Sequence, residues 1–322
     1  MTPTAADDDG GTARAPATKR PARRSPAKRA PRASKTPNKA VPANRGAGAN
    51  RSTERAPRAK RVPARSDRLG SPGTGVLITG GGSGIGRQTA LALAEVGRPV
   101  AIWDVDADGA EETATLCHDR FGVTADWSAV DVADSAAIAA GVPQAAAALG
   151  SLGGLVHAAG VSGAMAVDDI DDADWDRTLE VNLRAAAMLS KAVMAPFREA
   201  GPGSAVVFVS SIEGLFGSWL LTAYCASKGG VLGVMRSIAQ RFATEGFRVN
   251  AVCPGAVATP MLLPAFEIPG FRERIEERTP LGRIADPEEI ARPIRFLLSA
   301  EASFITGTYL TIDGGMTSVT AI

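Results

Sequence analysis

The sequence predicts an α/β fold in which a doubly wound parallel sheet forms a single domain after a basic tail. Three observations predict this fold class. Short β-branched runs alternate with Ala- and Leu-rich segments of helical periodicity, which is the pattern of a parallel sheet covered on both faces. The first run leads through a glycine cluster straight into a helical segment. Roughly 250 residues follow the tail, enough for one sizeable buried core.

The first strand, turn and helix carry a candidate nucleotide site. A strand is predicted at 76–79 and a helix at 87–96, which ends before Gly97. Glycines in the turn let the backbone approach a pyrophosphate, and the helix N-terminus offers free N–H groups. No Lys-Ser/Thr pair follows the G-x-x-x-G-x-G spacing, so a Walker phosphate loop is not expected. A flexible glycine-rich loop without a ligand is the alternative. The candidate cofactor-binding residues are Gly80, Ser83, Gly84, Ile85 and Gly86.

A second strand, predicted at 100–103, ends at Asp104, which lies 24 residues after Gly80. A carboxylate at this place can accept hydrogen bonds from the adenosine ribose and would repel a 2′-phosphate. Neither Ser83 nor Val105 supplies a compensating cation. NAD is therefore favoured over NADP. Arg87, on the first turn of the helix, is expected to be a solvated surface residue.

The remaining elements follow the same alternation. Two long helices are predicted at 174–198 and 224–244, and no internal repeat of 20–50 residues is present. Further strands are predicted at 123–130, 153–157, 205–210, 247–252 and 308–312.

The stretch from Tyr224 to Lys228 indicates proton chemistry. On a helix the two side chains share one face, because they are four residues apart. A phenol has a pKa near ~10, and a neighbouring ammonium would lower that pKa toward neutrality. Ser211, thirteen residues before Tyr224, can hold a carbonyl or alcohol oxygen. Alone, Y-x-x-x-K is a weak signal, and an amphipathic Tyr beside a solvated Lys is the alternative.

These motifs, in their order and spacing, resemble the short-chain dehydrogenase/reductase family over residues 72–322. The resemblance implies a Rossmann-type fold. It implies that Tyr224 is the acid/base, that Lys228 lowers the pKa of Tyr224 and binds the nicotinamide ribose, and that Ser211 orients the substrate oxygen. It also implies that Asn182 holds a water in a proton relay. The motifs that carry it are Thr79-Gly80-x-x-x-Gly84-Ile85-Gly86, Asp131-Val132, Asn182, Ser211, Tyr224-x-x-x-Lys228 and Pro254-Gly255.

The resemblance also implies further cofactor contacts and an assembly. Asp131 and Val132 would frame the adenine, and Ala159 with Gly160 would lie close to the cofactor ribose. The segment from Pro254 and Gly255 to Thr259 would fix the carboxamide, through the Val257 backbone and the Thr259 hydroxyl. The helices at 174–198 and 224–244 would pack against a second subunit, in a homotetramer or dimer.

One motif departs from the family pattern. The family usually has Asn-Asn-Ala-Gly where this chain has His157-Ala158-Ala159-Gly160. We expect His157 to be a buried, hydrogen-bonded residue that replaces a structural asparagine rather than a catalytic group. His118 is expected at the surface.

Cysteine usage and hydropathy exclude several classes of protein. The three cysteines, Cys117, Cys225 and Cys253, show no paired metal spacing, so no metal site is predicted. An odd number of cysteines without a secretory signal indicates reduced thiols in a cytoplasmic protein. No apolar stretch approaches the ~18–20 residues needed to span a bilayer, so no membrane association is expected.

The near-neutral net charge hides two oppositely charged parts. Residues 1–70 carry 18 Lys and Arg against five Asp and Glu, whereas residues 71–322 carry 17 against 29. The tail is rich in Ala, Pro, Arg and Lys, cannot bury enough apolar surface to order itself, and is predicted to be disordered. Three interpretations stay open: a solvated extension, an arm that binds nucleic acid or another polyanion nonspecifically through residues 14–68, or an arm that folds back on the acidic domain.

Two apolar segments bear on the substrate. Residues 261–283 would form a lid after the carboxamide motif, and residues 215–221 lie between Ser211 and Tyr224. An apolar pocket suits a hydrophobic alcohol or ketone, such as a cyclic, steroid-like or 3-oxoacyl compound; packing of the lid against the domain is the alternative. The sequence thus predicts an NAD-dependent oxidoreductase that interconverts a secondary alcohol and a ketone. The rival hypothesis is a catalytically idle dinucleotide-binding sensor with a nucleic-acid-binding arm.

Overall fold

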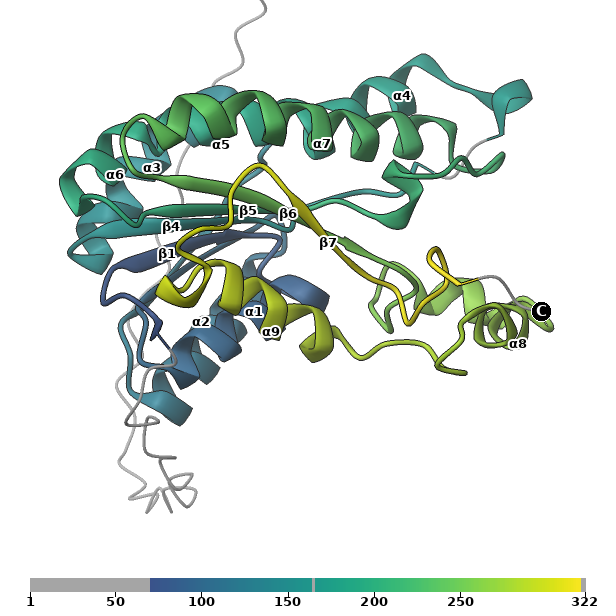
Figure 1. Ribbon diagram of the computed structural model, residues 1–322, viewed down its shortest axis with the longest axis horizontal. Helices are drawn as coiled ribbons and strands as arrows, with labels where there is room; N and C mark the ends of the chain where they lie inside the picture. Colours follow the sequence, from purple (N-terminus) through teal and green to yellow (C-terminus); the bar gives the residue numbers. More distant parts are fainter. Residues whose placement is uncertain (1–69, 164–165, 320–322) are drawn as a thin grey trace, which may run out of the picture. The chain divides into compact units, whose positions relative to one another are not determined.

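A parallel sheet is the framework of residues 70–163 and 166–319, the part of the chain that the computed structural model describes. Within this part the sheet has seven strands in the order β3-β2-β1-β4-β5-β6-β7, and every neighbouring pair is parallel (Figure 1). The strands are β1 (Gly75–Thr79), β2 (Val100–Asp104), β3 (Ala125–Ala129), β4 (Leu152–His157), β5 (Ala205–Val209), β6 (Arg248–Pro254) and β7 (Tyr309–Ile312).

Helices cover both faces of the sheet (Figure 1). One face carries α1 (Gly84–Glu95), α2 (Ala107–Phe121) and α9 (Pro287–Leu297). The other carries α3 (Ser135–Leu149), α5 (Ala185–Ala192), α6 (Met194–Ala200) and α7 (Thr222–Ala243), and α4 (Asp172–Leu179) packs beside α7. The predicted fold class, a doubly wound parallel sheet of the Rossmann type, is confirmed.

The strands separate two apolar cores because successive side chains point to opposite faces. In β1, Leu77 joins the core under α3, α5 and α7, whereas Val76 and Ile78 join the core under α1, α2 and α9. In β5, Phe208 and Val207 divide in the same way. Strands buried on both faces explain why the sequence shows continuous apolar runs rather than alternation.

The direction of strand addition reverses between β1 and β4, which are neighbours in the sheet. In open α/β sheets, ligands bind in the crevice outside the carboxyl ends of the strands at such a reversal. The loop after β1 begins at Gly80 and the loop after β4 begins at Ala158, so the glycine turn and the Ala159-Gly160 pair lie side by side there.

The helix predicted at 174–198 is wrong as a continuous element. The structure has α4, then a π-helical turn over Glu180–Arg184, then α5 and α6. Single π turns inside helices mark a local change of hydrogen bonding and often lie at functional sites. Here the turn contains Asn182, whose side chain bonds outside the helix. The third strand is also shorter than the predicted 123–130, while the helix predicted at 224–244 corresponds to α7.

Residues 1–69, 164–165 and 320–322 lie outside the described residues, and with them all of the predicted tail except Gly70. The predicted lid, residues 261–283, contains a short 3-10 helix over Leu263–Glu267 and α8 (Phe271–Arg278). In the described part of the chain, no helix is both long and apolar enough to cross a membrane.

Candidate active site

The glycine turn packs tightly against two other loops of the crevice. A side chain at Gly80, whose φ is 68°, would collide with the Ala159 backbone nitrogen at 2.5 Å. A side chain at Gly84 would lie 3.1 Å from a methyl carbon of Thr259. The loops after β1, β4 and β6 therefore meet at this turn. Only glycine leaves room beside them for the close approach of a ligand such as a phosphate group.

The start of α1 is free to bind an anion. The Ser83 side chain at its N-cap makes no capping hydrogen bond, and no acidic residue lies in its first turn. By contrast, Asp134 and Asp171 cap α3 and α4 through their carboxylates. Uncapped N–H groups at a helix start carry partial positive charge and suit a phosphate group. The residues of this turn thus fit the pyrophosphate of a dinucleotide.

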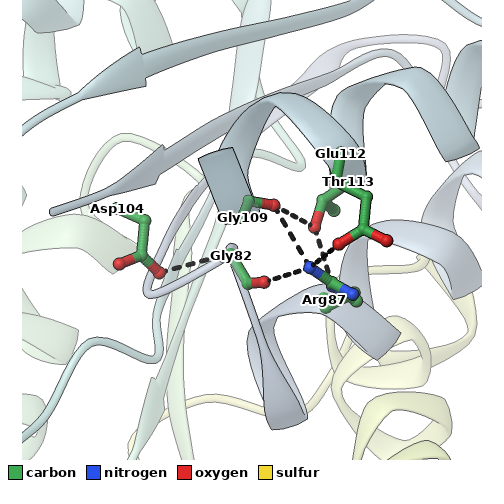
Figure 2. A network of polar contacts seen from close by, with 6 residues as sticks. All are labelled: Gly82, Arg87, Asp104, Gly109, Glu112 and Thr113. Carbon is green, nitrogen blue, oxygen red and sulfur yellow. Dashed lines mark hydrogen bonds and ion pairs between the residues drawn. The ribbon is translucent and has the colours of Figure 1, made fainter. Parts of the chain in front are cut away.

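Asp104 and Arg87 hold the middle of the glycine turn from two sides (Figure 2). The Gly82 N–H donates to Asp104 Oδ2 at 2.8 Å, and Arg87 Nη2 donates to the Gly82 carbonyl at 2.6 Å. Arg87 also bonds Thr113 and pairs with Glu112 of α2. The expectation that Arg87 is a solvated surface residue is wrong, because its side chain is only 24% exposed and is bonded to these partners. A cation in the first turn of a helix opposes the helix dipole, and these partners offset that cost.

Ser211, Tyr224 and Lys228 come together at the carboxyl end of β5. Ser211 follows the strand, and α7 supplies the other two. The Ser211 hydroxyl lies close enough to the Tyr224 phenol to lower its pKa. Lys228 Nζ lies 5.5 Å from the centroid of the Tyr224 ring and donates to the Val209 carbonyl at 2.9 Å. Tyr224 and Lys228 thus lie on one side of α7 with Ser211 beside them, as predicted.

Burial controls the acidity of this group. Removal from water raises the pKa of Tyr224 to about 12, against a downward contribution from the Ser211 hydrogen bond. The predicted downward shift of the Tyr224 pKa is therefore wrong in direction. Burial also lowers the pKa of Lys228 to about 8. At neutral pH the Tyr224 phenol therefore keeps its proton and can donate it, whereas the neighbouring Lys228 ammonium loses its proton more easily than an exposed lysine does.

Asn182 joins three segments around this volume. Its side-chain amide exchanges two hydrogen bonds of 2.9 Å with the Val161 backbone and donates to Ser227 Oγ at 3.0 Å. A side chain on Gly160 would lie 3.3 Å from both Asn182 Oδ1 and Lys228 Nζ. The π turn, the loop after β4 and the start of α7 are therefore fixed relative to one another at the lysine.

His157 is buried at the end of β4, as expected. Its Nδ1 lies 2.8 Å from the Thr79 hydroxyl on β1, and its Nε2 lies 3.3 Å from the Asn182 carbonyl oxygen. Burial lowers the pKa of His157 to about 4, with a further contribution from the Lys228 charge. The imidazole is therefore neutral near pH 7 and ties the end of the first strand to the π turn. His118 is exposed.

Asp131 and Val132 lie after β3, on the far side of β2 from the glycine turn. Val132 is buried, and the exposed Asp131 accepts hydrogen bonds from the Ala133 N–H and from Arg177 of α4 at 3.0 Å. Sequence reasoning missed Arg177. No local pattern signals it, because the pair joins residues 46 positions apart.

The segment after β6 contacts the residue after β7 and the glycine turn. Gly255 packs so closely on Asp313 that a side chain there would lie 2.9 Å from its Cα. Val257 forms a parallel bridge with Ala285, and Thr259 adjoins Gly84. Thr259 thus adjoins the glycine turn at Gly84, whereas Ala159 adjoins it at Gly80.

The cysteines lie apart from one another and from any group of metal-ligating side chains in the described residues. Cys117, Cys225 and Cys253 are free thiols, and no cluster of three metal-ligating side chains forms. Cys225 Sγ lies 3.6 Å from Glu213 Oε2, beside Tyr224 in the chain. Burial raises the pKa of Cys225, so this thiol is not an activated nucleophile.

Comparison with known proteins gives a consistent result. A family model described as enoyl-(acyl carrier protein) reductase matches residues 80–317. The chain is 43% identical to cis-4-hydroxycyclohexanecarboxylate dehydrogenase of Sinomonas cyclohexanicum, over 76% of this chain and 96% of the relative. It is 40% identical to 2-(S)-hydroxypropyl-CoM dehydrogenase 3 of Xanthobacter autotrophicus, with the same two coverages. The crystal structure of levodione reductase superposes with a TM-score of 0.73 at 32% identity, covering 78% of this chain and all of the other.

Proposed function

Because the chain belongs to the short-chain dehydrogenase/reductase family, we propose that it is an NAD-dependent oxidoreductase that interconverts a hydrophobic secondary alcohol and its ketone. It acts on CH–OH groups with a nicotinamide dinucleotide cofactor, as its family does. The preference for NAD and the class of substrate are the finer parts of the proposal.

The meeting of Ser211, Tyr224 and Lys228 beside the uncapped start of α1 carries the proposal. These residues lie at the carboxyl ends of the strands, where β1 and β4 mark the reversal of strand order. Proton donor and phosphate site would thus serve a single dinucleotide. A catalytically idle nucleotide-binding protein needs the phosphate site but has no use for a buried lysine beside a half-buried tyrosine.

In ketone reduction, Tyr224 would donate its proton to the carbonyl oxygen. Its raised pKa keeps the phenol protonated at neutral pH. The Ser211 hydroxyl, which lies beside the phenol, would hold the same oxygen. A bound nicotinamide dinucleotide would supply or accept the hydride. Oxidation of an alcohol needs the phenolate, which the Lys228 ammonium 5.5 Å from the ring centroid would favour.

Asp104 supports the preference for NAD. Its Oδ1 and Oδ2 accept hydrogen bonds from the Asp106 and Gly82 N–H groups, which aim the carboxylate along the edge of the glycine turn. Each oxygen has a second lone pair for a ribose hydroxyl. A 2′-phosphate at this place would meet a fixed negative charge.

Exposed apolar side chains near the site support a hydrophobic substrate. Phe216, Trp219 and Leu220, between Ser211 and α7, are 53%, 77% and 47% exposed. Met261 and Leu263, at the start of the predicted lid, are each 48% exposed. Exposed apolar groups of this size on both segments favour an apolar ligand over the alternative that the lid only packs on the domain. The cyclohexane ring named in one relative is of this class.

A screen tests the function directly. Secondary alcohols of the cyclic, steroid-like and 3-hydroxyacyl classes are offered with NAD or NADP, and absorbance of the reduced nicotinamide is followed. We expect turnover with NAD on at least one cyclic alcohol. If the protein binds NADH but turns over no class of alcohol with either cofactor, the result would favour the hypothesis of a catalytically idle sensor.

Two further proposals come from the family and from the charge of the chain. We propose that the chain self-associates, as its family does, and light scattering of the purified protein tests this.

We also propose that the basic segment 14–68 contacts polyanions through phosphate groups, because residues 1–70 carry 18 Lys and Arg against five Asp and Glu. These residues, up to 69, lie outside the described part of the chain, so this proposal rests on the sequence.

A further inference from the structure

The backbone of Gly82 lies between an acidic side chain, Asp104, and a basic one, Arg87 (Figure 2). Its N–H donates to Asp104 at 2.8 Å, and its carbonyl accepts from Arg87 at 2.6 Å. Asp104 and Arg87 are therefore separated by one glycine residue, on opposite sides of the turn that faces the nucleotide crevice. A positive and a negative group both stand within reach of the place where an adenosine ribose would lie.

Asp104 and Arg87 have opposite effects on cofactor preference. A carboxylate after the second strand binds the 2′-hydroxyl of NAD, whereas a nearby arginine accommodates the 2′-phosphate of NADP. Arg87 has capacity for another ligand, because its Nη1 makes no hydrogen bond with the described residues and its side chain is 24% exposed. Asp104 alone therefore does not account for a preference for NAD.

Glu112 of α2 changes this balance. Its Oε2 lies 2.6 Å from Arg87 Nη2, and the Glu112 side chain is 61% exposed. Around Gly82 there are thus two carboxylates and one guanidinium, with a net charge of −1. We infer that Glu112 is a second specificity-determining residue, which neutralises Arg87 and so keeps the site from accepting a 2′-phosphorylated dinucleotide.

This inference rests on the proposed function and makes a graded charge prediction. Removal of the Asp104 charge brings the net charge of the three groups to zero, and removal of the Glu112 charge as well brings it to +1. Glu112→Gln keeps an oxygen that can accept from Arg87, whereas Asp104→Asn keeps one oxygen for two donors, the Gly82 and Asp106 N–H groups, and so loses one of these hydrogen bonds. Both dinucleotides meet the same altered turn, so the ratio of their dissociation constants still reports the change of charge. Asp106, Asp108 and Glu111, at the start of α2, remain in these variants and contribute a constant background.

Binding of NADH and NADPH is measured without substrate, through the fluorescence of the reduced nicotinamide. The two dinucleotides differ only in the 2′-phosphate, so the ratio of their dissociation constants isolates it. We expect the NADPH/NADH ratio to fall roughly tenfold from wild type to D104N and roughly tenfold again in D104N/E112Q. Adding Arg87→Gln to the double variant should raise the ratio by a similar factor, with the NADH constant changed least.

Glu111→Gln is the matched control. Glu111 is exposed, precedes Glu112 on the same helix and loses the same charge, but it makes no ion pair among the described residues. The inference is overturned if E112Q shifts the ratio no more than E111Q in the D104N background, or if R87Q does not restore it. Those outcomes leave the proposed function intact. Wild-type protein that binds neither dinucleotide would overturn the proposed function together with this inference.

Discussion

His157 Nδ1 lies 2.8 Å from the hydroxyl oxygen of Thr79, across the pairing of β4 with β1. The hydroxyl can donate to Nδ1, which leaves the Nε2 proton to donate to the Asn182 carbonyl at 3.3 Å. Both ring nitrogens are thereby used by a neutral imidazole. The residue that departs from the family pattern thus connects the strand before the glycine turn with the π turn.

The burial of His157 makes the stability of the protein sensitive to acid. The folded-state pKa of His157 is about 4, below the ordinary histidine value of 6.5. Between these values the unfolded chain binds the proton and the native state does not, so the free energy of unfolding falls as the pH falls from about 6.5 to about 4. The full effect is about 3 kcal/mol.

His157→Asn should remove this part of the pH dependence. We expect the melting temperature of wild-type protein to fall more steeply between pH 7 and 4.5 than that of H157N, in calorimetry at matched ionic strength. His118→Gln changes an exposed histidine and should keep the wild-type slope. Equal slopes for wild type and H157N would mean that His157 is protonated in the native state.

Asn182→Ala should destabilise the protein through the π turn. The substitution leaves the Val161 N–H and carbonyl and the Ser227 hydroxyl without their side-chain partner. We expect a loss of about 2–4 kcal/mol in the free energy of unfolding, measured by urea denaturation. Ser227→Ala removes only one of these contacts and should cost about 1 kcal/mol. A loss in N182A no larger than in S227A would show that the contacts with Val161 contribute little.

The strands and the glycine turn could be predicted because their signals are local. The run Val76–Thr79 and the glycines after it encode the strand, the turn and the helix start within a dozen residues. The π turn could not, because the apolar periodicity of 174–198 continues through it. The partners that draw Asn182 away from regular helix geometry lie 21 and 45 residues away in the chain.

Electrostatics were predicted less well than position. The spacing of Tyr224 and Lys228 predicts that the two side chains meet, but it carries no information on how far both are removed from water. Burial reverses the direction of the expected Tyr224 shift. Arg87 did carry a signal, since a cation in the first turn of a helix is unfavourable unless it is paired. Its partner Glu112 could not be identified from spacing alone.

Removal of residues 1–69 should separate the tail from the enzyme. We expect protein that begins at Gly70 to keep NADH affinity and turnover within about twofold, because residues 70–163 and 166–319 contain every candidate site residue. Binding of full-length protein to duplex DNA, measured by fluorescence anisotropy at low salt, should be lost on truncation and should weaken steeply with salt. If full-length protein binds no DNA at low salt, the proposal of a polyanion-binding arm is wrong.

Tyr224→Phe should remove the proton donor and little else. Loss of an acid/base group costs roughly 10²–10⁴-fold in turnover, whereas NADH affinity should change by less than about twofold. The other tyrosine, Tyr309 on β7, supplies the matched control, and Tyr309→Phe should retain full turnover. In wild type, alcohol oxidation should accelerate as the pH rises toward the phenol pKa, and ketone reduction should not. Turnover retained in Y224F would remove Tyr224 from its proposed role.

Lys228→Met should raise or preserve stability at neutral pH while it abolishes turnover. Burial lowers the pKa of Lys228 to about 8, from the ordinary lysine value of 10.5. The charged form therefore opposes folding by about 3 kcal/mol below pH 8, and this penalty diminishes as the pH rises from about 8 to about 10.5. Methionine removes the penalty but leaves the Val209 carbonyl without its donor, at a cost of about 1–3 kcal/mol.

We therefore expect the melting temperature of K228M to equal or exceed that of wild type at pH 7, with a smaller difference at pH 10. Lys191→Met, at an exposed position of α5, should keep turnover and show no such pH-dependent difference. A buried cation whose removal stabilises the fold but stops the reaction is kept for chemistry rather than for folding. A clear fall in the melting temperature of K228M at pH 7, with turnover retained, would instead assign Lys228 a structural role.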